Sequence, residues 1–204
     1  MRLDKLIEAV LIAALVAFSA SYAHAQEFFA RLNGFEEIGA QNNESGAVLS
    51  NGSGTLRLSL DKHAGTATFT LTYSDVGTTP AKTGTVSQAH IHFGKRHVAG
   101  GVMVFFCATP PLATSPVAGT PACPANSGTV TGTFTGASVV GPTAQNVTPG
   151  DFNALVDALE SNTAYANIHT VVAGVPTGGF PAGEIRGQVR KGNGHDNDNK
   201  DHDR

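Results

Sequence analysis

Apolar and polar residues alternate with a period of two along much of the chain, and this pattern is typical of half-buried β-strands. Residues 54–60 alternate leucine with small or polar residues, and residues 66–73 repeat the alternation after a turn at 61–65. These two segments predict a hairpin. A continuous apolar run at 102–106 predicts a strand that is buried on both faces. The same patterns predict further strands at 28–32, 86–93, 128–140, 167–170 and 183–189.

One segment, residues 149–161, has the apolar spacing of a helix instead. Thr148 precedes it as a possible N-cap, and Pro149 suits the first helical position. The apolar face would carry Phe152, Leu155, Val156 and Leu159. Many short strands with a single helix predict an all-β fold, namely an antiparallel β-sandwich or barrel-like domain with one short helix.

The N-terminus has the pattern of a secretory signal peptide over residues 1–25. Arg2 and Lys5 precede an apolar run at 6–20, and Ala23-His24-Ala25 forms a small-x-small cleavage site. Cleavage after Ala25 would give a secreted or periplasmic protein, and the rest of the chain has no apolar run long enough to span a membrane. We therefore expect a signal peptide at 1–25, one β domain at 26–190 and a disordered polar tail at 191–204, which contains no apolar residue.

The cysteine content predicts a disulfide, and the net charge bears on the possible partners. An even number of cysteines in an exported chain favours a disulfide between Cys107 and Cys123, which would close a proline-rich loop. The net charge is −3, and removal of the signal peptide leaves it unchanged because two bases and two acids are lost together. This charge gives no indication of a nucleic-acid partner.

Histidines occur with the spacing that places them on one face of a strand. His90 and His92 share a face because alternate residues of a strand point the same way, and Asn167 and His169 share a face for the same reason. If the two strands are neighbours, three imidazoles converge in a set that suits zinc or copper. The alternative is a structural network in which the imidazoles bind carboxylate and carbonyl partners.

The last predicted strand adds Glu184, Arg186 and Gln188 on one face. Glu184 could form an ion pair with Arg186, or it could orient an imidazole as a hydrogen-bond acceptor behind a metal ligand. The alternative is that the pair simply holds the two final strands in register. Together with Asn167, these residues are expected to surround the histidines as a polar cluster.

Three sequence blocks in a fixed order resemble the CHRD domain family, named for repeats in chordin and also found in exported microbial single-domain proteins. The blocks are Gln88–His92, Tyr165–Thr170 and Ala182–Val189, and the resemblance covers about residues 28–190. It implies an extracellular β domain without a defined activity. We therefore expect an exported, non-catalytic binding or envelope-associated module whose partner is an unidentified protein or small ligand, with a possible histidine metal site.

An enzymatic alternative comes from the segment His90-Ile91-His92-Phe93-Gly94, which looks like the copper-binding strand of copper/zinc superoxide dismutases. Those enzymes also carry a loop with glycine, histidine and aspartate zinc ligands, and the present chain has no such run. A copper/zinc oxidoreductase of this type is therefore the second hypothesis, after the non-catalytic binding module.

Overall fold

The computed structural model describes residues 25–38, 46–80, 84–174 and 178–192. Residues 1–24 of the proposed signal peptide (1–25) and residues 193–204 of the proposed tail (191–204) lie outside these ranges. Within the described ranges, no helix has the length and apolar character needed to cross a membrane. The strands are β1 (Gln26–Asn33), β2 (Ser53–Asp61), β3 (Thr66–Ser74), β4 (Thr85–Phe93), β5 (Gly101–Ala108), β6 (Gly128–Phe134), β7 (Ala164–Val171), β8 (Ile185–Gln188) and β9 (Arg190–Lys191).

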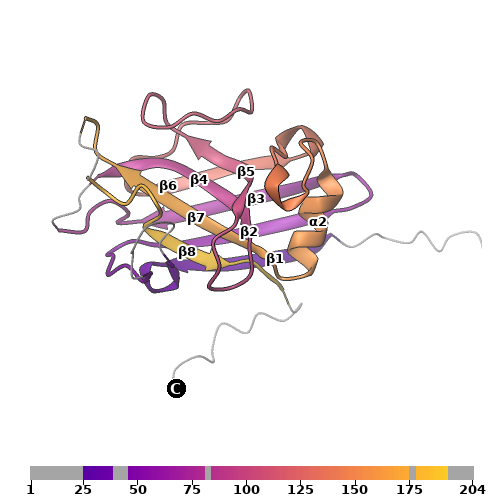
Figure 1. The fold of residues 1–204 in the computed structure, drawn as a ribbon, viewed down its shortest axis with the longest axis horizontal. Helices are drawn as coiled ribbons and strands as arrows, with labels where there is room; N and C mark the ends of the chain where they lie inside the picture. Colours follow the sequence, from indigo (N-terminus) through magenta and orange to yellow (C-terminus); the bar gives the residue numbers. More distant parts are fainter. Residues whose placement is uncertain (1–24, 39–45, 81–83, 175–177, 193–204) are drawn as a thin grey trace, which may run out of the picture.

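All the strands belong to one antiparallel sheet that curls into a nearly closed barrel (Figure 1). The order along the sheet is β5-β4-β7-β8-β1-β2-β3-β6. The short strand β9, which follows β8 in the chain, also pairs with β1. The two end strands approach each other, and the amide of Val140, just past β6, donates to the carbonyl of Met103 in β5 at 2.9 Å. The barrel-like, all-β prediction is confirmed.

The apolar residues of the alternating strands fill the barrel interior. Leu56, Leu58 and Leu60 of β2 are at most 1 % exposed, and they lie beside the apolar face of β3 in a continuous antiparallel register. Phe69 of β3 stacks on Phe134 of β6 with ring centroids 4.5 Å apart. Burying these side chains supplies the main driving force for closing the sheet.

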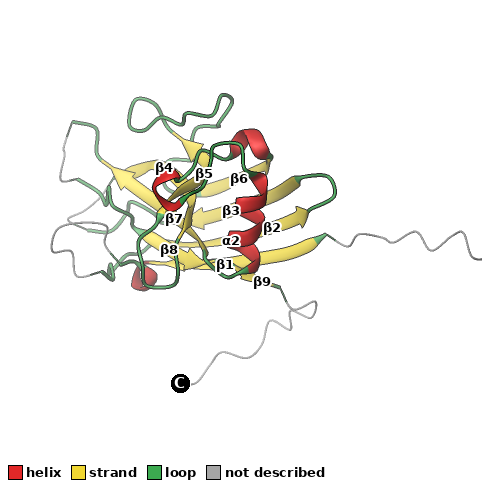
Figure 2. Ribbon diagram, turned by 45° about the vertical axis from the view of Figure 1, so that its right-hand side comes forward, coloured by secondary structure: helices red, strands yellow, loops and turns green. Residues whose placement is uncertain are grey.

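The helix α2 (Phe152–Glu160) lies across one end of the strands (Figure 2). Its apolar face, including Leu155 and Leu159, joins the same core. The helix starts later than the sequence indicated, because Asp151 rather than Thr148 caps it: the Asp151 carboxylate accepts from the amide of Ala154 at 3.1 Å. Among the described residues, three short 3-10 helices accompany it, at Gly34–Glu36, Gly136–Ser138 and Thr143–Gln145.

The structure also bears on two predicted element boundaries and on the predicted disulfide. The predicted strand at 128–140 ends at Phe134, because Gly136–Ser138 turns into a 3-10 helix. The predicted disulfide between Cys107 and Cys123 is confirmed. At the C-terminal end, Arg190 and Lys191 pair with β1, and the amide of Gly192 donates to the carbonyl of Glu27 at 2.7 Å. Strand pairing thus reaches Lys191, the first residue assigned to the tail.

Candidate metal centre

The strands β4 and β7 are neighbours in the sheet, as a shared histidine site requires. His90 lies opposite Asn167, His92 lies opposite Tyr165, and His169 lies opposite Gln88. The interior takes the alternate residues Ile91 and Ile168, so the three histidines occupy the outer face of the barrel wall. On its other side, β4 pairs with β5 and shifts register before His90 and again before His92, an irregularity that changes the direction of local side chains.

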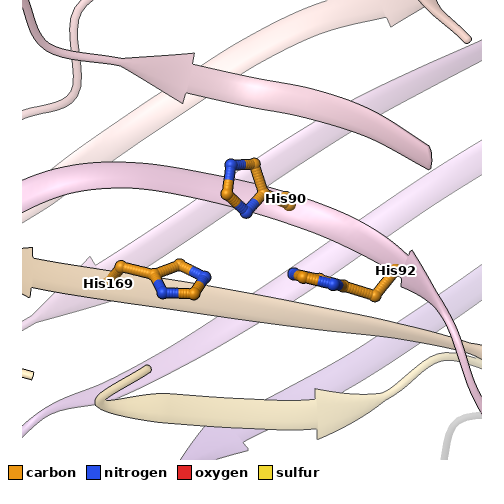
Figure 3. Close-up of side chains that lie close together, drawn as sticks. All are labelled: His90, His92 and His169. Carbon is orange, nitrogen blue, oxygen red and sulfur yellow. The ribbon is translucent and has the colours of Figure 1, made fainter. Parts of the chain in front are cut away.

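The three imidazoles converge on one space (Figure 3). Ring centroids are 5.3 Å apart for His90 and His92, 5.1 Å for His90 and His169, and 6.1 Å for His92 and His169. Each ring offers one nitrogen atom to this space, and the three nitrogen atoms lie within 4.8 Å of one another. Metal–nitrogen bonds are about 2 Å long, so small side-chain movements would allow all three nitrogens to bind one ion.

Backbone carbonyls orient two of the rings. The Nδ1 of His92 lies 2.9 Å from the carbonyl oxygen of Gly100, and the Nδ1 of His169 lies 3.0 Å from that of Pro181. A carbonyl only accepts, so each Nδ1 carries the proton and donates it, and each Nε2 is left with a free lone pair. Among the described residues, both Nε2 atoms are buried without a partner, and so are both ring nitrogens of His90.

Burial keeps the imidazoles neutral. His90, His92 and His169 are 3 %, 8 % and 7 % exposed. Desolvation lowers the pKa of His92 to about 3 and that of His169 to about 4, and it lowers the pKa of His90 well below its usual value, with repulsion from the neighbouring imidazoles adding to the effect on His90 and His92. Neutral imidazole is the form that binds metals, so protons do not compete with an ion near neutral pH.

Tyr165 and Arg186 extend the site across the sheet. The ring of Tyr165 stacks on His92 with centroids 4.7 Å apart and an interplanar angle of 5°. The Cζ of Arg186 lies 3.4 Å from the Tyr165 centroid, a cation–π contact. Because β4 and β8 flank β7, the imidazole and the guanidinium approach the phenol ring from opposite sides. Tyr165 was not predicted as a site residue, although strand alternation places it on the same face as Asn167 and His169.

The other polar residues of the cluster fix the loops around the site. Arg186 donates from Nη2 to the carbonyls of Lys95 and Val98 at 3.2 and 3.0 Å. Gln188 donates to the carbonyl of Gly94 at 3.2 Å, which ties down the same loop. This loop contains Gly100, whose carbonyl orients His92. Arg186 and Gln188 therefore help to position the Gly100 carbonyl that accepts from His92, and they do not contact the three converging nitrogens.

Asn167 also has a positioning role. Its amide donates to the carboxylate of Glu37 and to the carbonyl of Ile185 at 3.1 Å. Gly183 lies beside this contact with φ +135°, and a Cβ atom there would come 2.7 Å from Glu37 and 2.8 Å from Asn167. The backbone conformation therefore favours glycine at position 183, and a Cβ atom there would displace the side-chain contact between Glu37 and Asn167.

Glu184 was predicted to join the polar cluster around the histidines, and this prediction is wrong. It precedes β8, which begins at Ile185, and its carboxylate turns away from Arg186 and the imidazoles. It accepts from the hydroxyls of Ser50 and Thr170, both at 2.7 Å, and from the amide of Gly77 at 3.0 Å. The predicted strand alternation fails here because the chain bends between Gly183 and Ile185. Glu184 is fully buried and anchors the loops at 50 and 77.

The fold and this site define a class: a barrel-like antiparallel β domain with a buried histidine cluster on the outer face of its wall. The family model of the CHRD domain matches residues 28–189, which is most of the chain, and the chain belongs to this family. CHRD domains are extracellular, and the disulfide is consistent with an oxidising compartment. The family match does not favour the dismutase alternative. Comparison with curated proteins and with solved structures gave no match.

Proposed function

We propose that this CHRD domain is an exported, non-catalytic binding module that holds a transition-metal ion, copper or zinc, through His90, His92 and His169. Export would follow from the signal peptide at 1–25, with cleavage after Ala25. The observation that carries the proposal is the set of Nε2 atoms of His92 and His169, buried without partners and facing the same space as a nitrogen of His90.

The energetic cost of this arrangement supports a bound ion. A buried polar atom without a partner typically costs about 1–3 kcal/mol. Several such atoms gathered in one place would be a considerable loss for a domain whose total stability is about 5–15 kcal/mol. A metal ion accepts all three lone pairs at once and converts the loss into binding energy. A purely structural network explains the site less well, because the hydrogen bonds among the described residues satisfy only one nitrogen of His92 and one of His169.

The carbonyl contacts give the proposal a second support. Metal-binding histidines usually donate their other ring nitrogen to a carbonyl or carboxylate, which fixes the tautomer and the ring orientation. His92 and His169 do this with Gly100 and Pro181. These two carbonyl contacts hold the imidazoles in position before an ion arrives.

Elemental analysis of untagged protein, purified from the compartment into which it is exported, tests the proposal. We expect close to one copper or zinc per chain, removal of the metal by a strong chelator, and its loss in His92→Ala. His63 lies exposed in the turn between β2 and β3, so His63→Ala is the matched control and should keep the metal. Equal metal content in both variants would refute the site. The mass of the exported chain tests the cleavage, which should leave Gln26 as the first residue.

A further inference from the structure

The donor set of this site distinguishes between the two metals, and this inference rests on the proposed metal site. All three donors are neutral nitrogens, and the only carboxylate predicted to lie near them, that of Glu184, is bound to Ser50, Gly77 and Thr170 instead. We infer that the site is selective for monovalent copper, Cu(I), over Zn(II) and Cu(II).

Charge is the first argument for a monovalent ion. The cost of moving an ion from water into a protein interior rises with the square of its charge, so a divalent ion has roughly four times the penalty of a monovalent one. Neutral imidazoles leave the whole charge of the ion uncompensated. All three histidines are buried, so solvent does little to reduce this cost.

The neighbouring charged groups do not change this balance. Arg186 carries a positive charge against the face of Tyr165, which itself stacks on His92. Desolvation by burial lowers the pKa of the Arg186 guanidinium, and the carboxylate of Glu37, which lines a small cavity together with Arg186, opposes this shift. The two opposite charges therefore offset each other. No net negative charge from this pair remains to compensate a divalent ion.

Coordination number is the second argument. Zn(II) in proteins is nearly always bound by four ligands, and Cu(II) prefers four or more in a tetragonal arrangement, whereas Cu(I) is stable with three. A cavity of about 60 Å³ lies beside the site, and it touches His92 but neither His90 nor His169. Its wall includes Gly100, the partner of the His92 Nδ1, so the cavity opens beside that edge of the ring. This cavity therefore offers no room for a fourth ligand at the converging Nε2 atoms.

Aromatic rings shield the site on both sides of the histidines. Phe105 of β5 packs edge-on against His90 with centroids 4.4 Å apart, and Tyr165 covers His92. Such apolar surroundings restrict water, which a divalent ion would otherwise use to complete its coordination. The proposal involves binding only: copper enters and leaves as Cu(I), and no electron is transferred.

Competition titrations on the full exported chain test this inference. Under anaerobic conditions, Cu(I) is titrated against bicinchoninate, and Zn(II) and Cu(II) are titrated separately against chelators of known affinity. We expect one Cu(I) per chain with at least about 100-fold tighter binding than either divalent ion. His90→Gln, His92→Gln and His169→Gln should each weaken Cu(I) binding by more than about 100-fold, while His63→Ala binds as the wild type does. X-ray absorption should show three nitrogen ligands.

The outcomes separate this inference from the proposed function. If Zn(II) or Cu(II) bound through the same histidines as tightly as Cu(I), the metal selectivity would be wrong and the metal site would stand. If no metal bound, or if the three glutamine variants bound Cu(I) as the wild type does, both proposals would fail. Melting curves of each glutamine variant show whether it is folded, and binding by any one folded variant is enough to decide.

Discussion

Acidification should destabilise the metal-free protein through its buried histidines. Burial lowers the pKa of His169 to about 4 and that of His92 to about 3, from the ordinary value of 6.5. In the unfolded chain both imidazoles are in water and take up a proton near pH 6.5. The unfolded state therefore binds more protons than the folded state below this pH. The stability is fully present above about pH 6.5 and is lost as the pH falls toward the folded-state pKa values.

The magnitude follows from these shifts. Each pKa unit corresponds to about 1.36 kcal/mol, so the shift of His169 alone removes about 3 kcal/mol between pH 7 and pH 4. His92 contributes a similar amount over the same range. Their sum, about 6 kcal/mol, is comparable with the whole stability of a domain of this size. The metal-free protein should therefore be close to unfolding at pH 4.

Urea denaturation of metal-free protein at pH 7 and pH 4 measures this loss. Carboxylates also titrate in this range, so the informative comparison is between variants. His169→Gln should reduce the pH-dependent loss by about 3 kcal/mol relative to the wild type. If wild type and His169→Gln lost the same stability between the two pH values, the imidazole would titrate normally in the folded protein and the reasoning from burial would be wrong.

Three further predictions concern the supporting structure. Glu184→Gln should lower stability by about 2–4 kcal/mol, since four donors lose a charged acceptor, and should leave metal affinity unchanged; a weakened metal site in a fully stable variant would contradict this. Replacing Cys107 and Cys123 by serine should cost about 2–4 kcal/mol in urea titrations, and alkylation of the native protein without reductant should label no thiol. Truncation after Gly192 should leave the melting temperature within a few degrees of the full chain, whereas removal of Arg190 onwards should lower it further, because strand pairing ends at Lys191.

Strand alternation predicted the faces of the barrel wall because its cause is local. Successive residues point to opposite sides, so burial of Ile91 and Ile168 sends His90, His92 and His169 to the other face. Alternation contains no information about which strands are neighbours. The structure supplies this adjacency, since β4 and β7 pair in an antiparallel register.

Loop-dependent features could not be predicted in this way. The acceptors for His92 and His169 are the backbone carbonyls of Gly100 and Pro181, and every residue has a carbonyl, so no side-chain pattern identifies them. The direction of Glu184 depends on a bend after Gly183, a conformation that the alternation rule does not include. The start of α2 shows the same limit: both Thr148 and Asp151 are suitable N-caps, and in the structure Asp151 is the residue whose side chain caps the helix.

The order of the strands explains why distant sequence blocks form one site. The blocks Gln88–His92, Tyr165–Thr170 and Ala182–Val189 lie in or next to β4, β7 and β8, which are consecutive in the sheet. Side chains from the three strands therefore form a row across the wall, from His92 through Tyr165 to Arg186. Arg186 of β8 holds the loop that contains Gly100, whose carbonyl accepts from His92. A residue of β8 therefore helps to position a metal-binding side chain of β4. Arg186→Lys would keep the charge and lose the planar contacts, and should therefore weaken metal binding by about 10–100-fold in the same competition titration while leaving the fold intact.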